Sequence, residues 1–323
     1  MFHGPMISIC VPTYNASRHI EHTMATVLYQ DYENREIIIV DDASQDDTWY
    51  RLQKYSSVPG IRLFRNQNNL GIAGNWNRCL ELAEGEYVKY VHCDDMCYPD
   101  CVSTLVAEAK RVPEAALLFA SRHFLLDEVS PTTENLRFVR FLLSVGERQK
   151  AIKPGKNHGR DVLNMLFPGC QNIVGEPTAT LIRTRALSDL GGFDERFRQL
   201  IDIEAWVRLL LVHEAVFIPR ALCQWRVHER QASSLQAAEG VVLPELCQLY
   251  LKHREALKSS LESTTFRRFS WSIWINLLLR KRDYAGRLRG EDYSTARAAS
   301  YVDQGGIGGA IRNAVGHLAG AIR

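Results

Sequence analysis

The sequence has 323 residues, which is enough to form one α/β domain of catalytic size and a further small region. Its formal net charge is +2, which argues against a nucleic-acid-binding protein that depends on phosphate contacts. No window contains the roughly 18 uninterrupted apolar residues that a membrane span requires. The N-terminus lacks a cationic region followed by an apolar core, so we expect no secretory signal and a cytoplasmic location.

The charge is unevenly distributed along the chain. Residues 266–323 contain ten Lys and Arg but only four Asp and Glu, a net charge of +6, so residues 1–265 carry −4. A mildly acidic body is therefore followed by a basic tail.

The eight cysteines lie mostly in apolar surroundings and show no paired zinc-ribbon spacing. Cys93, Cys97 and Cys101 recur at intervals of four residues, which a metal site could use. Two aspartates interrupt this row, and the predicted structure changes from strand to helix across it. We therefore favour reduced cysteines that serve as small hydrophobic core residues.

The first 95 residues alternate between short β-branched or aromatic runs and segments of helical character. Residues 7–11 form a nearly continuous apolar run closed by Pro12, as expected of a central strand buried on both faces. We predict further strands at 36–40, 61–64 and 85–93 and helices at 20–29 and 76–83. Strands and helices that alternate with short links predict a right-handed, mostly parallel sheet of the nucleotide-binding kind.

After residue 95 the pattern predicts a helix at 101–111 and a strand at 115–120. Residues 121–170 are less regular, with scattered charges and a basic loop at 150–156. We expect this middle segment to carry a variable binding surface.

Two of the predicted strands end in adjacent carboxylates. Asp41 and Asp42 follow the second strand, and Asp94 and Asp95 follow the fourth. In an open α/β sheet ligands bind beyond the carboxyl ends of the strands, so these acids would line an acidic cleft. Adjacent acids need a cation between them, and a divalent ion with oxygen ligands is the simplest candidate. A solvated turn is an equally strong alternative for Asp94 and Asp95, because Asp favours turns.

The turn after the first strand, Thr13-Tyr14-Asn15, offers a hydroxyl, a phenol and an amide. These groups can stack against and hydrogen-bond a flat base, although an ordinary strand-to-helix turn explains them as well. Asp46 and Asp47 fit the N-cap and first turn of a helix better than a catalytic role.

Several short motifs occur in a fixed order between residues 6 and 235. They are the segments 8–15, 40–44, 47–48, 69–71, 83–87, 94–95, 191–195 and 225–228, together with Asn77 and Asp202. As an ordered set they resemble the inverting GT-A-fold glycosyltransferases of family two, which build bacterial polysaccharides and glycolipids of the cell envelope. The resemblance implies an α/β catalytic domain at 1–235, with a Rossmann-like sheet flanked by helices. Residues 236–323 lie outside the resemblance, and we expect them to form a basic helical C-terminal extension.

The resemblance also implies that a nucleoside-diphosphate sugar binds at the sheet edge. Pro12, Thr13, Tyr14 and Asp42 match the family's base-binding residues. The full set of residues expected to bind the nucleotide sugar is Pro12, Thr13, Tyr14, Asn15, Asp41, Asp42, Asn69, Gly71, Asn77 and Asp94. His92 departs from the family, which often has an acid at that position.

Asp94 and Asp95 match the metal and diphosphate motif of the same family. Cleavage of an anomeric bond to a nucleoside diphosphate requires neutralisation of the leaving phosphates, which Mg²⁺ or Mn²⁺ provides as a Lewis acid. Asp94 and Asp95 would hold this ion, and His228 would add a metal or phosphate contact. A lone His is more often structural, and only the motif around His228 favours the metal role.

A further carboxylate must take the proton of the acceptor hydroxyl on the opposite face of the sugar, so that direct displacement inverts the anomeric centre. Asp202, four residues before Trp206, is the expected base. Apolar residues at 200, 201 and 203 would desolvate it and raise its pKa. The alternative is that Asp202 caps the helix that runs to residue 211. A glycine turn at 191–194 is expected near the acceptor.

The basic tail begins with aromatic and basic residues at helical spacing between 266 and 282. This pattern suits a helix in the plane of an anionic membrane, or a helix packed on the catalytic domain or on a second subunit. Residues 305–323 place five apolar residues on one face of a glycine-weakened helix, which therefore requires a partner surface. We favour peripheral contact with the inner face of the membrane near a lipid-linked acceptor, and a homodimer is a further option.

These inferences favour a metal-dependent inverting glycosyltransferase of the hexosyltransferase type, with a UDP-sugar as the favoured donor and a growing glycan or a lipid-linked molecule as the acceptor. A sugar-phosphate nucleotidyltransferase is the closest alternative, but it would require a glycine-rich, basic phosphate loop at residues 12–15. A sugar-nucleotide or glycan-binding module without turnover is a third interpretation, against which Asp94, Asp95 and Asp202 argue. No nucleic-acid partner is expected.

Overall fold

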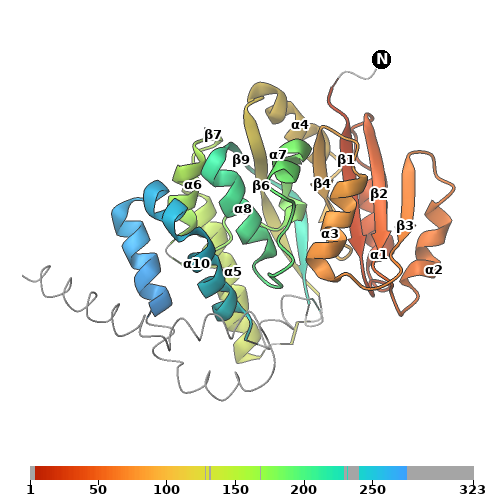
Figure 1. Cartoon of the computed structure of the whole chain (residues 1–323). Helices are drawn as coiled ribbons and strands as arrows, with labels where there is room; N and C mark the ends of the chain where they lie inside the picture. Colours follow the sequence, from red (N-terminus) through yellow and green to blue (C-terminus); the bar gives the residue numbers. More distant parts are fainter. Residues whose placement is uncertain are drawn as a thin grey trace, which may run out of the picture.

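The computed structural model describes residues 4–127, 129–130, 132–167, 169–228, 231 and 240–274. These residues form one mixed sheet with helices on both faces (Figure 1). Within the described part of the chain the sheet has nine strands, in the order β3-β2-β1-β4-β8-β6-β9-β5, with β7 paired to β9.

The first half of the chain supplies the parallel part of the sheet. Its elements are β1 (Ile7–Thr13), α1 (Ile20–Leu28), β2 (Arg35–Asp41), α2 (Thr48–Leu52), the 3-10 helix η1 (Gln53–Tyr55), β3 (Ile61–Arg65), α3 (Gly71–Leu82) and β4 (Tyr87–Tyr90). β2 and β4 flank β1, and β3 flanks β2, all in parallel. The predicted alternation is confirmed, with α3 beginning at Gly71 rather than at residue 76.

β1 shows why this part of the sequence becomes a central strand. All seven of its residues are buried, and successive side chains alternate between the two faces of the sheet. Ile9 and Val11 join the core cluster that contains α1 and α4 (Cys101–Arg111), whereas Cys10 joins the cluster that contains α3 and α8 (Ile201–Val212). Both faces of β1 therefore need apolar side chains, which explains the nearly continuous apolar run.

The second half of the chain extends the sheet in mixed orientation. Its remaining elements are β5 (Met96–Cys97), β6 (Ala115–Leu126), α5 (Thr133–Gln149), β7 (Gly155–Asn157), α6 (Gly159–Leu166), the 3-10 helix η2 (Pro177–Ala179), β8 (Thr180–Arg183), α7 (Thr184–Asp189), β9 (Glu214–Val227) and α10 (Val242–Ser260). β8 runs antiparallel to β4 and β6, and β6 runs parallel to β9. The mostly parallel arrangement thus holds for β1 to β4, and the strands beyond β4 are mixed.

Residues 121–170 are more regular than predicted. β6 continues to Leu126, and α5 and α6 occupy much of the segment. Leu142, Val145 and Gln149 of α5 are buried at helical spacing, whereas most of its charged residues are exposed. The scattered charges thus lie on the solvent face of an amphipathic helix, and the exposed Leu136 and Leu143 on that face obscure its period in the sequence.

The described residues of the C-terminal extension pack on the rest of the chain. α10 lies against α8 (Figure 1), and a further helix covers residues 263–274. Phe269 and Ile273 of this helix are buried in the same core cluster as α8. Residues 266–274 therefore pack on the part of the chain that contains α8, which agrees with the expected packing of the tail on the preceding domain. The rest of the basic tail, residues 275–323, lies outside the described residues.

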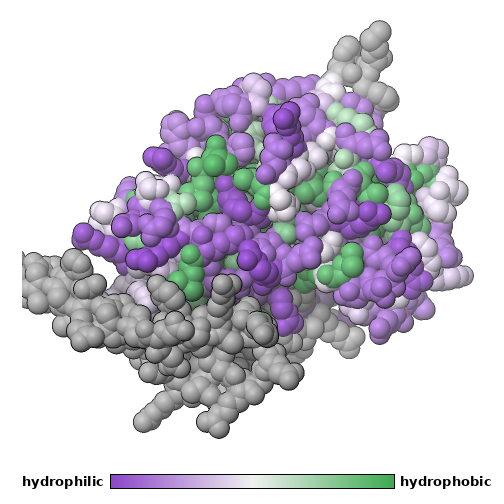
Figure 2. Space-filling view, in the orientation of Figure 1, coloured by the Kyte–Doolittle hydropathy of each residue, from purple (hydrophilic) through white to green (hydrophobic). Residues whose placement is uncertain are grey.

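The surface and core show two further features. The face seen in Figure 2 is largely hydrophilic, and apolar residues form separate patches on it. No helix in the described ranges is both long enough and apolar enough to cross a membrane. Cys97 and Cys101 are 5% and 1% exposed, which agrees with the predicted role as core residues.

Candidate active site

The carboxyl ends of β1, β2 and β4 lie next to one another at one edge of the sheet. Thr13 at the end of β1 is in register with Asp41 at the end of β2. Val91, directly after β4, donates a backbone hydrogen bond to the Cys10 carbonyl of β1 (2.9 Å). The loops that follow these three strands therefore converge.

The loop after β1 is tied to the loop after β2. Asn15 has a φ of 47°, in the left-handed region. Its backbone N–H donates to Ser44 Oγ (3.0 Å), and its side-chain Oδ1 accepts from the Gln45 N–H (2.9 Å). Pro12 and Thr13 are buried, whereas the Tyr14 side chain is 43% exposed. Because Asn15 holds the two loops together, the Tyr14 ring is the group of this loop that is best placed to contact a ligand.

Asp41 organises the loop after β2. It is fully buried, and its carboxylate accepts from the Ser44 N–H (3.1 Å) and from the Ser44 hydroxyl. Arg65 of β3 lies 3.2 Å from the same carboxylate (Nε to Oδ2). Asp41 therefore serves as the internal anchor of this loop.

Asp42 caps α3 from the neighbouring position. It is 2% exposed and accepts from the Asn66 side chain (2.8 Å) and from the backbone N–H groups of Leu70 (2.9 Å) and Gly71 (3.0 Å). Asn69 donates to the Asp42 carbonyl (3.2 Å). A carboxylate at a helix N-terminus satisfies free N–H groups and is favoured by the helix dipole. Asn69 and Gly71 thus line the same edge as Asp42.

Asn77 links α3 to the glycine turn at 191–194. Its Nδ2 donates to the Phe193 carbonyl (2.9 Å), and its Oδ1 accepts from the Phe193 N–H (2.7 Å). A Cβ at Gly192 would lie 2.5 Å from this Oδ1, so the close approach requires glycine. Both ends of the amide are engaged, and the structure therefore gives Asn77 a linking role.

The two aspartates after β4 have different surroundings. Asp95 is 1% exposed, and its two oxygens accept from the Thr178 hydroxyl (2.6 Å) and from the Arg226 backbone N–H (3.0 Å). The Asp94 side chain is 26% exposed, and its Oδ2 lies 3.2 Å from His228 Nε2. Asp95 therefore holds the loop in place, and Asp94 is the more exposed of the two and contacts His228.

The pKa values of Asp94 and Asp95 are also shifted in opposite directions. Burial and the neighbouring Asp94 charge raise the pKa of Asp95 well above its ordinary value. Burial also opposes ionisation of Asp94, but the hydrogen bond with His228 and the nearby His92 hold the pKa of Asp94 below its ordinary value. Asp94 is thus the ionised carboxylate of the pair.

His92 occupies the wall of the site. Its ring stacks on Trp76, with centroids 4.9 Å apart and an interplanar angle of 19°. Burial lowers the pKa of His92 to about 4, so the ring is neutral at physiological pH. Its Nε2 is buried and makes no hydrogen bond within the described residues.

Arg226 of β9 fastens the end of this strand to the loop after β4. It is 7% exposed, and its Nε donates to the Asp94 carbonyl (2.9 Å), in addition to the backbone bond to Asp95. Its Nη1 lies 3.1 Å from Asp127 at the end of β6. Three segments that are far apart in the sequence are therefore joined next to Asp94.

Asp202 lies in the first turn of α8, whose N-cap position is Leu200. Its Oδ1 accepts from the Ile203 N–H (2.7 Å), and its Oδ2 accepts from the Asn172 side chain (2.6 Å). Leu200, Ile201 and Ile203 are buried around it, as the sequence predicts. Burial, followed by the Glu176 charge, raises the pKa of Asp202 to about 7. Asp202 therefore exchanges its proton near neutral pH.

Glu204 faces the other way, as expected from its position two residues further along the helix. It is fully buried and accepts from Arg208 (2.9 Å), and it lies 2.5 Å from Lys252 and 2.9 Å from His253 of α10. Burial raises its pKa, but the hydrogen bonds with His253, Arg208 and Lys252 and the Arg208 charge outweigh burial and lower the pKa to about 2. Glu204 thus joins α8 to α10.

The segment 172–178, between α6 and β8, joins the two carboxylate positions. Asn172 at one end contacts Asp202, and Thr178 at the other end contacts Asp95. Only five residues lie between Asn172 and Thr178 along the chain. The Asp202 and Asp95 positions therefore lie on the two ends of one short segment.

Glu176 lies between these ends. After burial, its charge contributes to the raised pKa of both Asp95 and Asp202, so it is near each. The side chain of Arg122 in β6 is 4% exposed and lies 2.7 Å from Glu176 (Nε to Oε2). Asp95 and Asp202 are thus each near the ion pair of Arg122 and Glu176.

None of Asn172, Glu176, Arg122 and Arg226 is among the site residues that the sequence pattern predicts. A signal exists for the first two, because they flank Gly175 in a polar stretch directly before the apolar strand β8, where a loop at a sheet edge is expected. Arg122 lies within a strand, and nothing local marks it.

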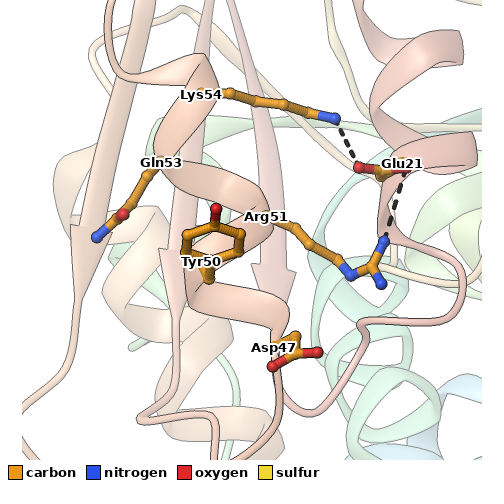
Figure 3. Close-up of a pocket in the computed structure, with 6 residues that line it drawn as sticks. All are labelled: Glu21, Asp47, Tyr50, Arg51, Gln53 and Lys54. Atoms are coloured by element: carbon orange, nitrogen blue, oxygen red, sulfur yellow. Dashed lines mark hydrogen bonds and ion pairs between the residues drawn. The ribbon is translucent and has the colours of Figure 1, made fainter.

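A separate groove of about 490 Å³ lies between α1 and α2 (Figure 3). It is lined by Glu21, Asp47, Tyr50, Arg51, Gln53 and Lys54. Glu21 lies 2.6 Å from Lys54 and 3.8 Å from Arg51, so the charges of the groove pair with one another (Figure 3). The groove contains no residue of the candidate active site.

Asp46 accepts from the Thr48 N–H (2.9 Å) at the start of α2, in the predicted capping role.

Comparison with known proteins agrees with the geometry. The model of glycosyl transferase family 2 matches residues 8–191. An uncharacterized protein of Mycobacterium tuberculosis is 36% identical over 220 residues, which is 68% of this chain and 66% of that protein. The chain thus spans about two thirds of the length of that relative.

Two solved structures show the same fold at low identity. TarS of S. aureus, residues 1–349 in complex with UDP, has a TM-score of 0.61 at 17% identity. The match covers 88% of this chain and 75% of the TarS chain. A mannosyltransferase of Pyrobaculum calidifontis in complex with GDP-Man and Mn²⁺ has a TM-score of 0.59 at 17% identity. The match covers 94% of this chain and 81% of the mannosyltransferase chain. These likenesses confirm the predicted GT-A type of α/β fold.

Proposed function

Because the chain belongs to glycosyl transferase family 2, we propose that it transfers a sugar from a nucleoside-diphosphate sugar to a hydroxyl of a glycan or lipid-linked acceptor, with inversion at the anomeric carbon. The observation that carries this proposal is that segment 172–178 contacts Asp202 at one end and Asp95, the neighbour of Asp94, at the other. One carboxylate is ionised, and the other accepts a proton near neutral pH.

In this proposal the nucleotide binds at the loops after β1 and β2. The exposed Tyr14 ring would stack on the base, while Asp41 and Asp42 hold the loops that form the wall of the pocket. The structures of TarS and of the mannosyltransferase contain UDP and GDP-Man, which share the diphosphate. A UDP-sugar is the favoured donor of this chain, in keeping with the resemblance.

The groups at Asp94 suit a divalent cation whose coordination is completed by substrate. Asp94 is ionised, and His228 Nε2 lies 3.2 Å from it. Within the described ranges, no group of three or more His, Cys, Asp and Glu side chains is arranged to hold a metal ion. Mg²⁺ is usually bound by one or two carboxylates together with substrate phosphates and water, which fits this arrangement.

Asp94 and His228 would therefore hold Mg²⁺ or Mn²⁺, and Asp95, whose oxygens are both engaged, would keep Asp94 in position. When bound, the ion would neutralise the charge that develops on the leaving diphosphate.

Asp202 would act as the general base. As the acceptor oxygen bonds to the anomeric carbon, the bond to the diphosphate oxygen breaks, and the hydroxyl proton passes to Asp202. Since a pKa of about 7 leaves a large fraction ionised at neutral pH and keeps the carboxylate basic, it suits this role. Direct attack by the acceptor inverts the anomeric configuration.

An acceptor at the membrane surface is consistent with α5. Leu136, Arg140 and Leu143 lie on one stripe of this helix, and the two leucines are 51% and 58% exposed. A groove of about 370 Å³ adjoins them, lined by His123, Phe124, Leu126, Val139, Leu142 and Leu143. Apolar and basic side chains together suit contact with anionic lipid.

The test is a panel of nucleotide sugars incubated with and without Mn²⁺ or Mg²⁺. The proposal predicts metal-dependent release of nucleoside diphosphate from one donor, accelerated by a glycan acceptor. Pyrophosphate formation from a sugar phosphate and a nucleoside triphosphate would instead identify a nucleotidyltransferase. Thermal stabilisation by a donor without release of the diphosphate would identify a binding module.

A further inference from the structure

Asn172 holds two partners through its two amide atoms. Its Nδ2 donates to Asp202 Oδ2 (2.6 Å), and its Oδ1 accepts from the Gly175 N–H (2.9 Å). The Gly175 carbonyl in turn accepts from Trp206 Nε1 on α8 (3.0 Å). The loop that carries Asn172 is therefore fastened to the same helix that carries Asp202.

The Gly175 contact fixes which way the amide points. A backbone N–H can only donate, so the group that faces it must be the oxygen of the amide. The NH₂ group must then face Asp202, and it can only donate to that carboxylate. Asn172 thus holds Asp202 Oδ2 as an acceptor and favours the ionised form of the carboxylate.

We infer that Asn172 is a positioning residue for Asp202, an inference that rests on the proposed function. Its hydrogen bond sets the rotation of the carboxylate, while the Ile203 N–H holds the other oxygen. The remaining lone pairs are left for the acceptor hydroxyl. The same bond supports proton release from Asp202 against the opposing effect of burial.

Other charged and titratable groups also face Asp202. Glu176 disfavours the ionised carboxylate, and Arg122 of β6 favours it. Cys170, in the loop after α6, lies near enough for Asp202 to contribute, after burial, to its raised pKa of about 12. The thiol is therefore neutral. Asn172 differs from Glu176 and Arg122 because it is an uncharged group that donates a hydrogen bond directly to Asp202.

Two substitutions at Asn172 distinguish positioning of the Asp202 carboxylate from support of the loop through the Gly175 N–H. Asn172→Asp keeps an oxygen for the Gly175 N–H but places a carboxylate against Asp202, whereas Asn172→Ala removes both contacts. For Asn172→Asp we expect the acidic limb of the pH profile of kcat/KM to move up by at least about one pH unit, because adjacent carboxylates share a proton. At neutral pH we expect kcat to fall by about tenfold or more, with the donor KM changed by less than about threefold.

For Asn172→Ala we expect a smaller upward movement of the same limb, together with a lower thermal midpoint. A wild-type pH profile and kcat for Asn172→Asp, with only Asn172→Ala impaired, would overturn the inference and leave Asn172 as a loop residue. Asp202→Asn is measured in parallel. Retained turnover in that variant would contradict the proposed base itself, which is a different result from either Asn172 outcome.

Discussion

The Asp202 carboxylate is costly to ionise in the folded protein. Burial and Glu176 raise its pKa from 3.8 to about 7, whereas the unfolded chain keeps the ordinary value. Between about pH 4 and about pH 7 the native state therefore binds more protons than the unfolded state. The contribution of Asp202 to the free energy of unfolding consequently falls as the pH rises through this window.

Asp202→Asn is therefore expected to stabilise the protein at about pH 8 and to lose this advantage near pH 4. The size of the pKa displacement sets an upper limit of about 4 kcal/mol on the gain. Urea unfolding of both proteins at the two pH values measures it. An equal difference at both values would show that Asp202 titrates normally in the native state.

Asp94 and Asp95 are expected to respond differently to the same substitution. Asp94→Asn should raise the Mn²⁺ concentration required for half-maximal activity by at least ~10-fold, because substitutions around a metal site weaken metal affinity by at least that factor. Asp95→Asn should leave that concentration nearly unchanged, but it should lower the free energy of unfolding by about 1–3 kcal/mol, because one of its two buried hydrogen bonds is lost.

Metal titration and thermal unfolding of the two variants provide this comparison. A large rise in the Mn²⁺ requirement of Asp95→Asn, with an unchanged requirement for Asp94→Asn, would reverse the assignment of the two aspartates.

Residues of the site differ in how far the sequence could predict them. Asp94 follows a strand and Asp202 begins a helix, each within a recognisable motif. The Asp94 side chain is partly exposed, which suits a metal ligand, and Asp202 is desolvated, which suits a general base. Asn172 and Glu176 acquire their partners only through the tertiary fold, since Asn172 lies 30 residues from Asp202. Local sequence carries no information on such a contact.

At the scale of elements, α10 holds the start of α8. Glu245 accepts from the backbone N–H groups of residues 198, 199 and 200 at 2.7, 2.9 and 2.8 Å. Residue 202 follows in the first turn of α8. The C-terminal extension is thus part of the support of the candidate base.

Glu245→Ala is expected to lower the free energy of unfolding by about 1–3 kcal/mol, because three N–H groups lose their acceptor. It should also lower kcat, since the first turn of α8 loosens. Glu255→Ala is the matched control on the same helix, because the Glu255 side chain is 79% exposed, and its effect should stay within about 0.5 kcal/mol. Equal effects of the two substitutions on unfolding and kcat would contradict the anchoring role.

Whether an element could be predicted depends on how clearly its burial appears in the sequence. β1 and β2 are buried on both faces and read as apolar runs. α5 is buried on one side only, and exposed leucines on its other side remove the contrast between its faces. The mixed orientation of β8 and β9 depends on long-range pairing, which local patterns do not reveal.

At the scale of the whole molecule, the membrane contact is predicted from the basic tail, and the proposal adds α5 to it. We expect the protein to co-sediment with anionic vesicles and to be released by salt. The double substitution Leu136→Asp and Leu143→Asp should weaken this binding. Val212→Asp is the control, because Val212 is an exposed apolar residue at the end of a different helix, 64% exposed. Binding that is insensitive to salt and to the α5 double substitution would contradict the contact.

The most direct test of the central claim is a comparison of turnover and donor binding in Asp202→Asn and the wild type, with Mn²⁺ and the donor identified in the panel. If Asp202 is the base, the variant should bind the donor with an unchanged dissociation constant while turnover falls by at least ~100-fold, the lower range for general-base catalysis. Turnover of the variant close to that of the wild type would show that another group takes the proton.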